Sequence, residues 1–297
     1  MANTLQANEA KDFKGGVSTE KPAFFIKGAE SLDWGMKSRL ARIFDAKSRK
    51  TLMMAIDHGY FEGPIAGLEQ VNLSIVPALP YVDALMLTRG ILRTCIPPEF
   101  NRGIVLRVSG GPSVLKVLSN EQLVVDIQDA VRLGASALAV GVFIGTEFET
   151  QTVHNLTRLV DLGSQYGIPV LAVTATEDET PRDARYFRMA CRICAELGAH
   201  FVKTYYVPKG FETVTASCPV PVVIAGGEKV PELEALTMTH RALQEGAAGV
   251  DMGRNIFQAE APAAMAQAVR AVVHNGEAPE KALDLYRSLQ DLGVKEG

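Results

Sequence analysis

Short apolar runs alternate with longer amphipathic segments from Thr51 onward. Runs rich in β-branched residues and bounded by turn residues are typical of strands buried on both faces of a sheet. Segments whose apolar residues recur three or four positions apart are typical of covering helices. The pattern therefore predicts repeated βα units and a parallel sheet. The predicted strands are Thr51–Ile56, Ala84–Thr88, Ile104–Val108, Ala137–Phe143, Pro169–Thr174, Phe201–Tyr205, Val222–Ala225 and Gly249–Met252.

Helix-length segments separate most of these strands, and a glycine that suits a C-terminal cap follows most of them. They are Glu121–Leu133, Glu147–Tyr166, Arg182–Leu197, Pro231–Gln244 and Ala261–His274. Eight βα units of roughly 25 to 30 residues each correspond to the α/β fold of a (β/α)8 TIM barrel. An open doubly wound sheet is the alternative. Its Gly-x-Gly-x-x-Gly turn is missing after the first strand, where Asp57-His58-Gly59-Tyr60-Phe61 stands.

The segments outside this repeat predict two additions to a single barrel domain. Residues 1–50 form an N-terminal extension, polar at first and then helix-like over Leu32–Phe44. Residues 51–297 form the barrel and an extra C-terminal helix over Ala278–Leu292. No low-complexity linker divides the chain, which favours one domain.

Composition and charge narrow the class of protein. The chain has 297 residues, of which 47% are hydrophobic and 22% charged, with a net charge of −4 and no block of basic residues. A nucleic-acid partner or a membrane-surface partner is therefore not expected. No signal-like start or run of 18 apolar residues occurs, and we expect a cytoplasmic enzyme whose four cysteines are reduced. No metal-ligand motif accompanies the histidines, so we expect no metal and no bound cofactor.

Lys203 is the most informative single residue, because it interrupts the apolar strand Phe201–Tyr205. A lysine is rarely buried without a partner or a function. Desolvation could lower its pKa by roughly three units and leave a neutral amine that attacks a carbonyl to form a Schiff base. The alternative is a lysine at the strand edge that reaches water or pairs with an acid.

Polar residues also follow the predicted first strand. Asp57 and His58 would lie at the C-terminal end of the barrel, where barrel enzymes build their active sites. A carboxylate and an imidazole at this position suit proton transfer. A hydrogen-bonded turn without catalytic function is the alternative reading of the same pair.

Glycines close the last two predicted strands. Gly226 and Gly227 follow the seventh strand, and Gly253 and Arg254 follow the eighth. These are the usual positions of a phosphate site in such barrels, where backbone N–H groups and a guanidinium converge. Ordinary tight-turn glycines are the alternative. Together with Lys203, the pattern indicates a phosphorylated carbonyl substrate.

These motifs resemble those of the class I aldolases of the deoxyribose-phosphate and archaeal fructose-bisphosphate type, and the similarity runs from about Ser31 to Val273. The segments that carry it are Leu32–Met36, Asp57–Phe61, Thr88–Leu92, Lys203–Tyr206, Ile224–Gly227 and Gly253–Phe257. The resemblance implies a Schiff base at Lys203, a carboxylate at Asp57 that assists it, and a phosphate held at Gly226, Gly227, Gly253 and Arg254. It also implies a ring-like homo-oligomer, commonly a decamer.

Two reactions are implied within this family. Its thiolase branch, associated with autoinducer-2 degradation, moves an acetyl group from a phosphorylated diketone to coenzyme A as co-substrate, and this is the first expectation. Aldol cleavage of a ketose phosphate such as fructose 1,6-bisphosphate is the second. A barrel isomerase without a covalent step and a non-catalytic oligomeric barrel are the alternatives from other classes.

One residue departs from the family pattern. A tyrosine usually ends the fourth strand and transfers protons, but this chain has Phe143 there. Tyr60, His58 or Tyr205 could take its place, and an altered substrate is an equal alternative. Tyr205 is favoured, because strand alternation places it on the same face as Lys203 and places Tyr206 on the other.

Overall fold

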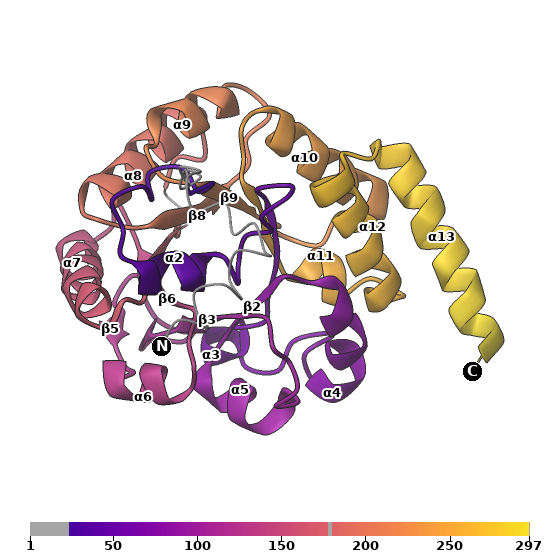
Figure 1. Cartoon of the computed structure of the whole chain (residues 1–297), viewed down its shortest axis with the longest axis horizontal. Coiled ribbons are helices and arrows are strands. Elements are labelled where there is room, and N and C mark those ends of the chain that lie inside the picture. The colour runs from indigo at the N-terminus through magenta and orange to yellow at the C-terminus, as the bar shows by residue number, and fades with distance from the viewer. Residues whose placement is uncertain (1–23, 178–179, 297) are drawn as a thin grey trace, which may run out of the picture.

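The computed structural model describes residues 24–177 and 180–296, with eight parallel strands closed into a barrel (Figure 1). The order around the barrel is β1-β10-β9-β8-β7-β6-β3-β2. These strands are β1 (Thr51–Ala55), β2 (Ala84–Leu87), β3 (Gly103–Arg107), β6 (Ala137–Val142), β7 (Val170–Thr174), β8 (Phe201–Tyr205), β9 (Val222–Ala225) and β10 (Gly249–Met252). The predicted TIM barrel is confirmed, and all eight predicted strands occur within two residues of their predicted bounds.

Alternation along each strand divides the apolar side chains into two layers. Met53, Met86 and Phe201 belong to the layer inside the barrel. Leu52 and Val202 belong to the layer between the strands and the helices. Because both layers are buried, each strand reads in the sequence as a continuous apolar run. A polar side chain on an inward position therefore faces the barrel axis, which is what positions the site.

Helices surround the barrel, and shorter elements lie in the loops. They are α3 (Gly59–Glu62), α4 (Val71–Ser74), η1 (Val76–Tyr81), α5 (Arg89–Cys95), α6 (Ile127–Arg132), α7 (Glu149–Tyr166), α8 (Ala184–Glu196), α9 (Phe211–Ser217), α10 (Glu232–Gln244), α11 (Arg254–Phe257) and α12 (Pro262–Asn275). Among these described elements, none is a helix long and apolar enough to cross a membrane.

The predicted helix over Glu121–Leu133 was wrong in its first half. The backbone of β5 (Gln122–Leu123) pairs instead with β4 (Ser109–Gly110) as a short antiparallel ladder. The extended Asp126 then precedes α6, which begins only at Ile127. The spacing of apolar residues could not reveal this difference from the prediction. The Glu121 side chain makes a contact inside the barrel mouth, and this contact holds the chain close to the mouth.

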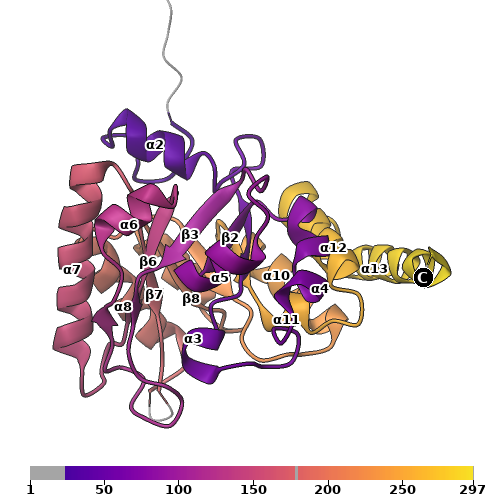
Figure 2. The ribbon, with the colours of Figure 1, turned by 90° about the horizontal axis from the view of Figure 1, so that it is seen from below.

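The N-terminal end of the barrel is closed by the chain before β1. In the predicted extension 1–50, residues 1–23 lie outside the described residues, and α2 (Trp34–Leu40) crosses that end of the barrel (Figure 2). Leu40 and Phe44 are buried with the inner strand residues, and the Phe44 ring meets the Phe201 ring edge-on at 5.6 Å. The predicted C-terminal helix is α13 (Pro279–Glu296), which lies outside the barrel against α10 and α12.

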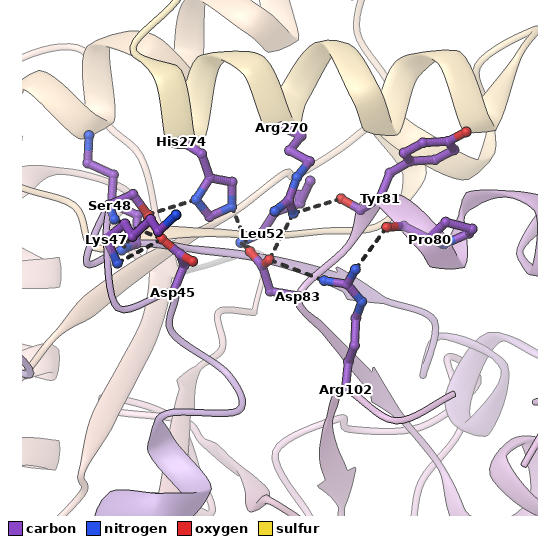
Figure 3. A network of polar contacts seen from close by, with 11 residues as sticks. Asp45, Lys47, Ser48, Leu52, Pro80, Tyr81, Asp83, Arg102, Arg270 and His274 are labelled. Carbon is purple, nitrogen blue, oxygen red and sulfur yellow. Dashed lines mark hydrogen bonds and ion pairs between the residues drawn. The ribbon is translucent and has the colours of Figure 1, made fainter. Parts of the chain in front are cut away.

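Near the same end, the buried carboxylate of Asp83 joins several elements (Figure 3). It accepts the backbone N–H of Leu52 at 2.7 Å and meets Arg270 at 2.8 Å and His274 at 2.7 Å, both from α12. His274 in turn contacts Ser48 Oγ at 2.7 Å. The carboxylate therefore ties the start of β2 to β1, to α12 and to the loop before β1. These contacts lower the pKa of Asp83 against the opposing effect of burial.

Candidate active site

A cavity of about 230 Å³ opens at the C-terminal ends of the strands, opposite α2. Its walls include all eight residues that the sequence indicates for the site: Asp57, His58, Lys203, Tyr205, Gly226, Gly227, Gly253 and Arg254. Closure of the barrel brings these residues together from β1, β8, β9 and β10, although they span nearly 200 positions of the chain. The catalytic and binding roles assigned to them stay predictions.

Lys203 lies on an inward position of β8, and 8% of it is exposed. Its Nζ is 2.8 Å from Oδ2 of Asp251, an inward residue of β10 that is itself buried. The Lys203 amine is also 4.0 Å from the sulfur of Met86. The surroundings of this amine are therefore not only apolar, because a carboxylate faces it directly.

Burial raises the pKa of Asp251, while the nearby Lys203 acts in the opposite direction. Among the described residues, neither carboxylate oxygen of Asp251 receives a hydrogen bond from another group. A carboxylate that is desolvated in this way is a stronger base than one in water. Asp251 can thus accept a proton from Lys203 and leave the neutral amine that imine formation requires.

A second buried charge cluster lies across the cavity at the end of β3. Arg107 Nη2 is 2.6 Å from Glu121 Oε1, and its Nη1 is 3.7 Å from Asp57 Oδ2. Tyr60 donates its hydroxyl proton to the same Glu121 oxygen at 2.5 Å. The other Glu121 oxygen accepts from Ser109 Oγ at 2.7 Å. Asp57 thus faces a guanidinium that the other contacts hold in place.

His58 lies at the start of α3 with its ring edge-on to Phe257 at 5.6 Å between centroids. Its Nδ1 is buried and has no hydrogen-bond partner among the described residues. Burial lowers the pKa of His58 to about 4; Asp57 opposes this shift, and Lys203 adds to it. The imidazole is therefore neutral at neutral pH, so it can accept a proton but does not supply a cation.

The glycine-rich ends of β9 and β10 form one wall of the cavity. Asn255 shapes this wall, because its Nδ2 donates to the carbonyl of Gly226 at 2.8 Å and its Oδ1 accepts the Val230 N–H at 2.9 Å. A Cβ on Gly253 would lie 2.5 Å from the Ala55 carbonyl oxygen. The loop is thus held in place by the Asn255 side-chain bonds and by the close packing of Gly253 against Ala55.

Arg254 borders the same wall and makes an ion pair with Glu228 at 2.7 Å. The Glu228 side chain is 80% exposed, so an arriving phosphate can displace it at little cost. The Nε of Arg254 is buried and has no hydrogen-bond partner among the described residues. These features suit a guanidinium that receives an anion.

Tyr205 is the last residue of β8, two positions after Lys203, and Tyr206 lies just beyond the strand. Tyr205 lines the cavity, and the Arg182 guanidinium lies 5.4 Å from its ring centroid. Tyr206 instead donates to Glu245 at 3.0 Å, away from the cavity. Phe143 also lines the cavity, so the wall at the end of β6 carries an apolar ring where the family pattern places a hydroxyl.

Sequence reasoning missed Asp251, Arg107 and Glu121. Asp251 and Arg107 gave the same signal as Lys203, since each is a charged residue in an otherwise apolar strand. Glu121 gave no such signal, because it lies in a loop and only the folded chain brings it to Arg107. Cys191 and Cys194 are buried free thiols on α8. In residues 24–177 and 180–296, no cluster of His, Cys, Asp and Glu could hold a metal ion.

Comparison with known proteins agrees with this geometry. Residues 51–259 match the model of the DeoC/LacD family aldolases. An uncharacterized aldolase of Pasteurella multocida is 55% identical over 96% of this chain and 99% of its own. The 3-hydroxy-5-phosphonooxypentane-2,4-dione thiolase of Yersinia enterocolitica is 54% identical over 96% of this chain and 98% of its own.

Among solved structures, an archaeal fructose 1,6-bisphosphate aldolase superposes with a TM-score of 0.72 at 25% identity, covering 82% of this chain and all of its own. A Schiff-base-forming fructose-1,6-bisphosphate aldolase superposes with a TM-score of 0.71 at 26% identity, covering 80% of this chain and 99% of its own. The chain belongs to the DeoC/LacD aldolase family, the class I aldolases that its motifs indicated.

Proposed function

We propose that this protein is a 3-hydroxy-5-phosphonooxypentane-2,4-dione thiolase, which acts in autoinducer-2 breakdown and yields dihydroxyacetone phosphate and acetyl-CoA. The observation that carries the proposal is the buried Lys203 amine beside Asp251, in the same cavity as the glycine wall and Arg254. Relatives 53 to 54% identical over nearly the whole chain have that name. Coenzyme A is the co-substrate in this proposal, and no bound cofactor takes part.

The residues act as follows in the proposed reaction. Asp251 takes a proton from Lys203, whose amine then forms an imine with the ketone next to the phosphate-bearing carbon. Gly226, Gly227, Gly253 and Arg254 hold the phosphate, which fixes that ketone over the amine. The protonated imine accepts the electron pair of the neighbouring C–C bond when this bond breaks. Asp57 moves the protons, with His58 and Tyr205 as further candidates at the cavity wall.

Borohydride trapping tests the imine. Incubation with dihydroxyacetone phosphate and borohydride should add the reduced ligand to the peptide that contains Lys203, as measured by mass spectrometry. The variant Lys203→Met should give no adduct. Lys209→Met is the matched control, because Lys209 is exposed six positions further on, and it should label like the wild type. Absence of a Lys203 adduct in the wild type would rule out the imine.

Aldol cleavage of a ketose phosphate is the second candidate, favoured by the similarity to the archaeal fructose-bisphosphate aldolases. The two reactions differ in their need for coenzyme A. Release of dihydroxyacetone phosphate from the dione only when coenzyme A is present supports the thiolase. Release from fructose 1,6-bisphosphate without coenzyme A supports the aldolase. A non-catalytic barrel predicts neither product.

We further propose a cytoplasmic homo-oligomer, with a decamer as the assembly that the family resemblance implies. Trp34 on α2 is 81% exposed and Leu115 is 86% exposed, so both apolar side chains are open to contact with another subunit. Light scattering coupled to size-exclusion chromatography measures the subunit count. Trp34→Ser should lower it if α2 contributes to the assembly.

A further inference from the structure

The guanidinium of Arg107 is held on one side only. Its Nε donates to the Ser109 carbonyl at 3.2 Å, and its Nη2 meets Tyr60 Oη and Glu121 Oε1. Its Nη1 makes no hydrogen bond among the described residues. The nearest carboxylate to Nη1 is Asp57, at 3.7 Å, which is beyond hydrogen-bond distance. Two N–H donors of a buried cation are therefore left for a ligand in the cavity that Arg107 lines.

The surroundings of Arg107 fix where those donors point. The guanidinium carbon is 4.8 Å from the Tyr60 ring centroid, so the ring covers one of its faces. Glu121 is bonded on both carboxylate oxygens, one of them by Ser109, whose Oγ also accepts the Gly141 N–H at 2.9 Å. A Cβ on Gly141 would lie 2.9 Å from Arg107 Nη2, so only glycine there leaves room for the pair. These close contacts hold the guanidinium in one position, which an ion pair at the surface would not require.

We propose that Arg107 is a catalytic residue of the acyl-transfer step. Its Nη1 donates a hydrogen bond to the carbonyl oxygen of the acyl group that is cleaved from the phosphorylated diketone. This inference rests on the proposed function. Glu121 and Tyr60 are positioning residues. They hold the guanidinium, and their own polar atoms are all engaged in hydrogen bonds within this cluster.

The chemistry of a thiolase explains why a fixed cation suits this position. The thiol of coenzyme A gives its proton to Asp57, and its sulfur adds to the acyl carbon while the carbonyl electron pair moves to oxygen. That oxygen is then negative and accepts from Arg107. When the C=O bond re-forms, the C–C bond breaks, and its electron pair enters the protonated imine of Lys203. The products are a thioester and an enamine.

The remaining steps restore the enzyme. Asp57 returns the proton to the enamine carbon, and water hydrolyses the imine to free the phosphorylated ketone and the Lys203 amine. Aldol cleavage needs something different at the same place, namely a group that removes a hydroxyl proton. An arginine remains protonated and cannot serve as that group, and Phe143 has no hydroxyl. Asp57, which lies 3.7 Å from Arg107, is the group at this place that could take such a proton.

The test separates imine formation from acyl transfer. In Arg107→Lys, trapping of dihydroxyacetone phosphate on Lys203 should stay within a few-fold of wild type, while kcat for acetyl-CoA formation falls by about 10²–10³-fold, the usual effect of losing an oxyanion donor. Arg132→Lys is the matched control. Its side chain is 74% exposed, and it should change neither measurement. An Arg107→Lys enzyme with the wild-type kcat overturns the proposal.

A second variant guards against a folding defect, since loss of one partner of a buried ion pair is destabilising. Arg107→Met combined with Glu121→Gln removes both charges together and should give the same split between trapping and transfer. Equal loss of both measurements in a folded double variant also overturns the proposal, because Arg107 would then serve the imine or the fold. If the wild type makes no acetyl-CoA from the dione, the proposed function itself fails and this inference fails with it. That outcome is visible before any variant is made.

Discussion

The Nζ of Lys203 lies 2.8 Å from the Asp251 carboxylate, and the two residues come from β8 and β10, which are separated by β9 in the barrel. Both side chains point to the barrel axis and are buried, with 8% of Lys203 and 1% of Asp251 exposed. Burying both charges has a desolvation cost that can exceed the gain from their attraction. The pair has a chemical use here, because the amine must lose a proton before it attacks a carbonyl.

Asp251→Asn tests this relationship. The amide keeps the shape of the side chain but cannot take a proton, so imine formation should slow by about 10²–10⁴-fold, as for loss of a general base. The rate of borohydride trapping with dihydroxyacetone phosphate measures it. Asp284→Asn on the exposed face of α13 is the control. Trapping at the wild-type rate in Asp251→Asn would show that Lys203 loses its proton by another route.

The sequence predicted this pair only in part. Lys203 was recognised because a charge in an apolar strand is conspicuous, but Asp251 was not, although it interrupts Gly249–Met252 in the same way. The eight strands and the positions of the site residues followed from local patterns that repeat along the chain. Contacts such as Arg107 with Glu121 depend on where a loop returns to the barrel, and no local pattern records that.

Gly253→Ala should damage the proposed phosphate site. The new methyl group would lie 2.5 Å from the Ala55 carbonyl oxygen and 2.6 Å from His58 Cε1, so the loop must shift. We expect a loss of about 1–3 kcal/mol in the free energy of unfolding and a raised KM for the phosphorylated substrate. Gly90→Ala in α5 is the matched control, since nothing lies within 4 Å of the added carbon. Denaturant unfolding and steady-state kinetics measure the two effects.

His58 should titrate well below an ordinary histidine. Because burial lowers its pKa from 6.5 to about 4, the folded protein binds fewer protons than the unfolded chain between these pH values. The resulting stability is complete above pH 6.5 and is lost as the pH falls toward 4. The His58 ring signals in an NMR titration should show a midpoint near 4, and His58→Gln should flatten the fall in Tm across this range.

His200 provides the matched variant for that experiment. Burial lowers its pKa to about 4 as well, but its Nδ1 accepts the Val170 N–H at 3.0 Å, at the start of β7 and far from the cavity. His200→Gln should change the pH dependence of Tm in the same direction and leave activity unchanged. Only His58→Gln should alter both. Equal activities of His58→Gln and wild type would remove His58 from the mechanism.

Asp83 should stabilise the barrel at every pH above the range in which its carboxyl group titrates. Against the opposing effect of burial, its hydrogen bonds from Leu52, Arg270 and His274 lower its folded pKa below the usual aspartate value of 3.8. The contribution is therefore present above pH of about 4 and is lost as the pH falls through the folded pKa. Asp83→Asn should lower the free energy of unfolding by about 3 kcal/mol at pH 7, as for a broken buried pair. The difference from wild type should shrink in acid, whereas Asp284→Asn should show no such dependence.

Phe143→Tyr tests which reaction the cavity wall permits. Phe143 is 4% exposed and occupies an inward position at the end of β6, so a hydroxyl added to its ring enters the cavity. Aldol cleavage requires a group that exchanges a proton with the substrate hydroxyl, whereas acyl transfer requires a donor to a carbonyl oxygen. The variant should therefore gain coenzyme A-independent cleavage of fructose 1,6-bisphosphate, measured as dihydroxyacetone phosphate released. Phe61→Tyr, which adds a hydroxyl to another ring of the cavity wall, is the control. Equal gains in both variants would mean that any added hydroxyl suffices, and that position 143 does not decide the reaction.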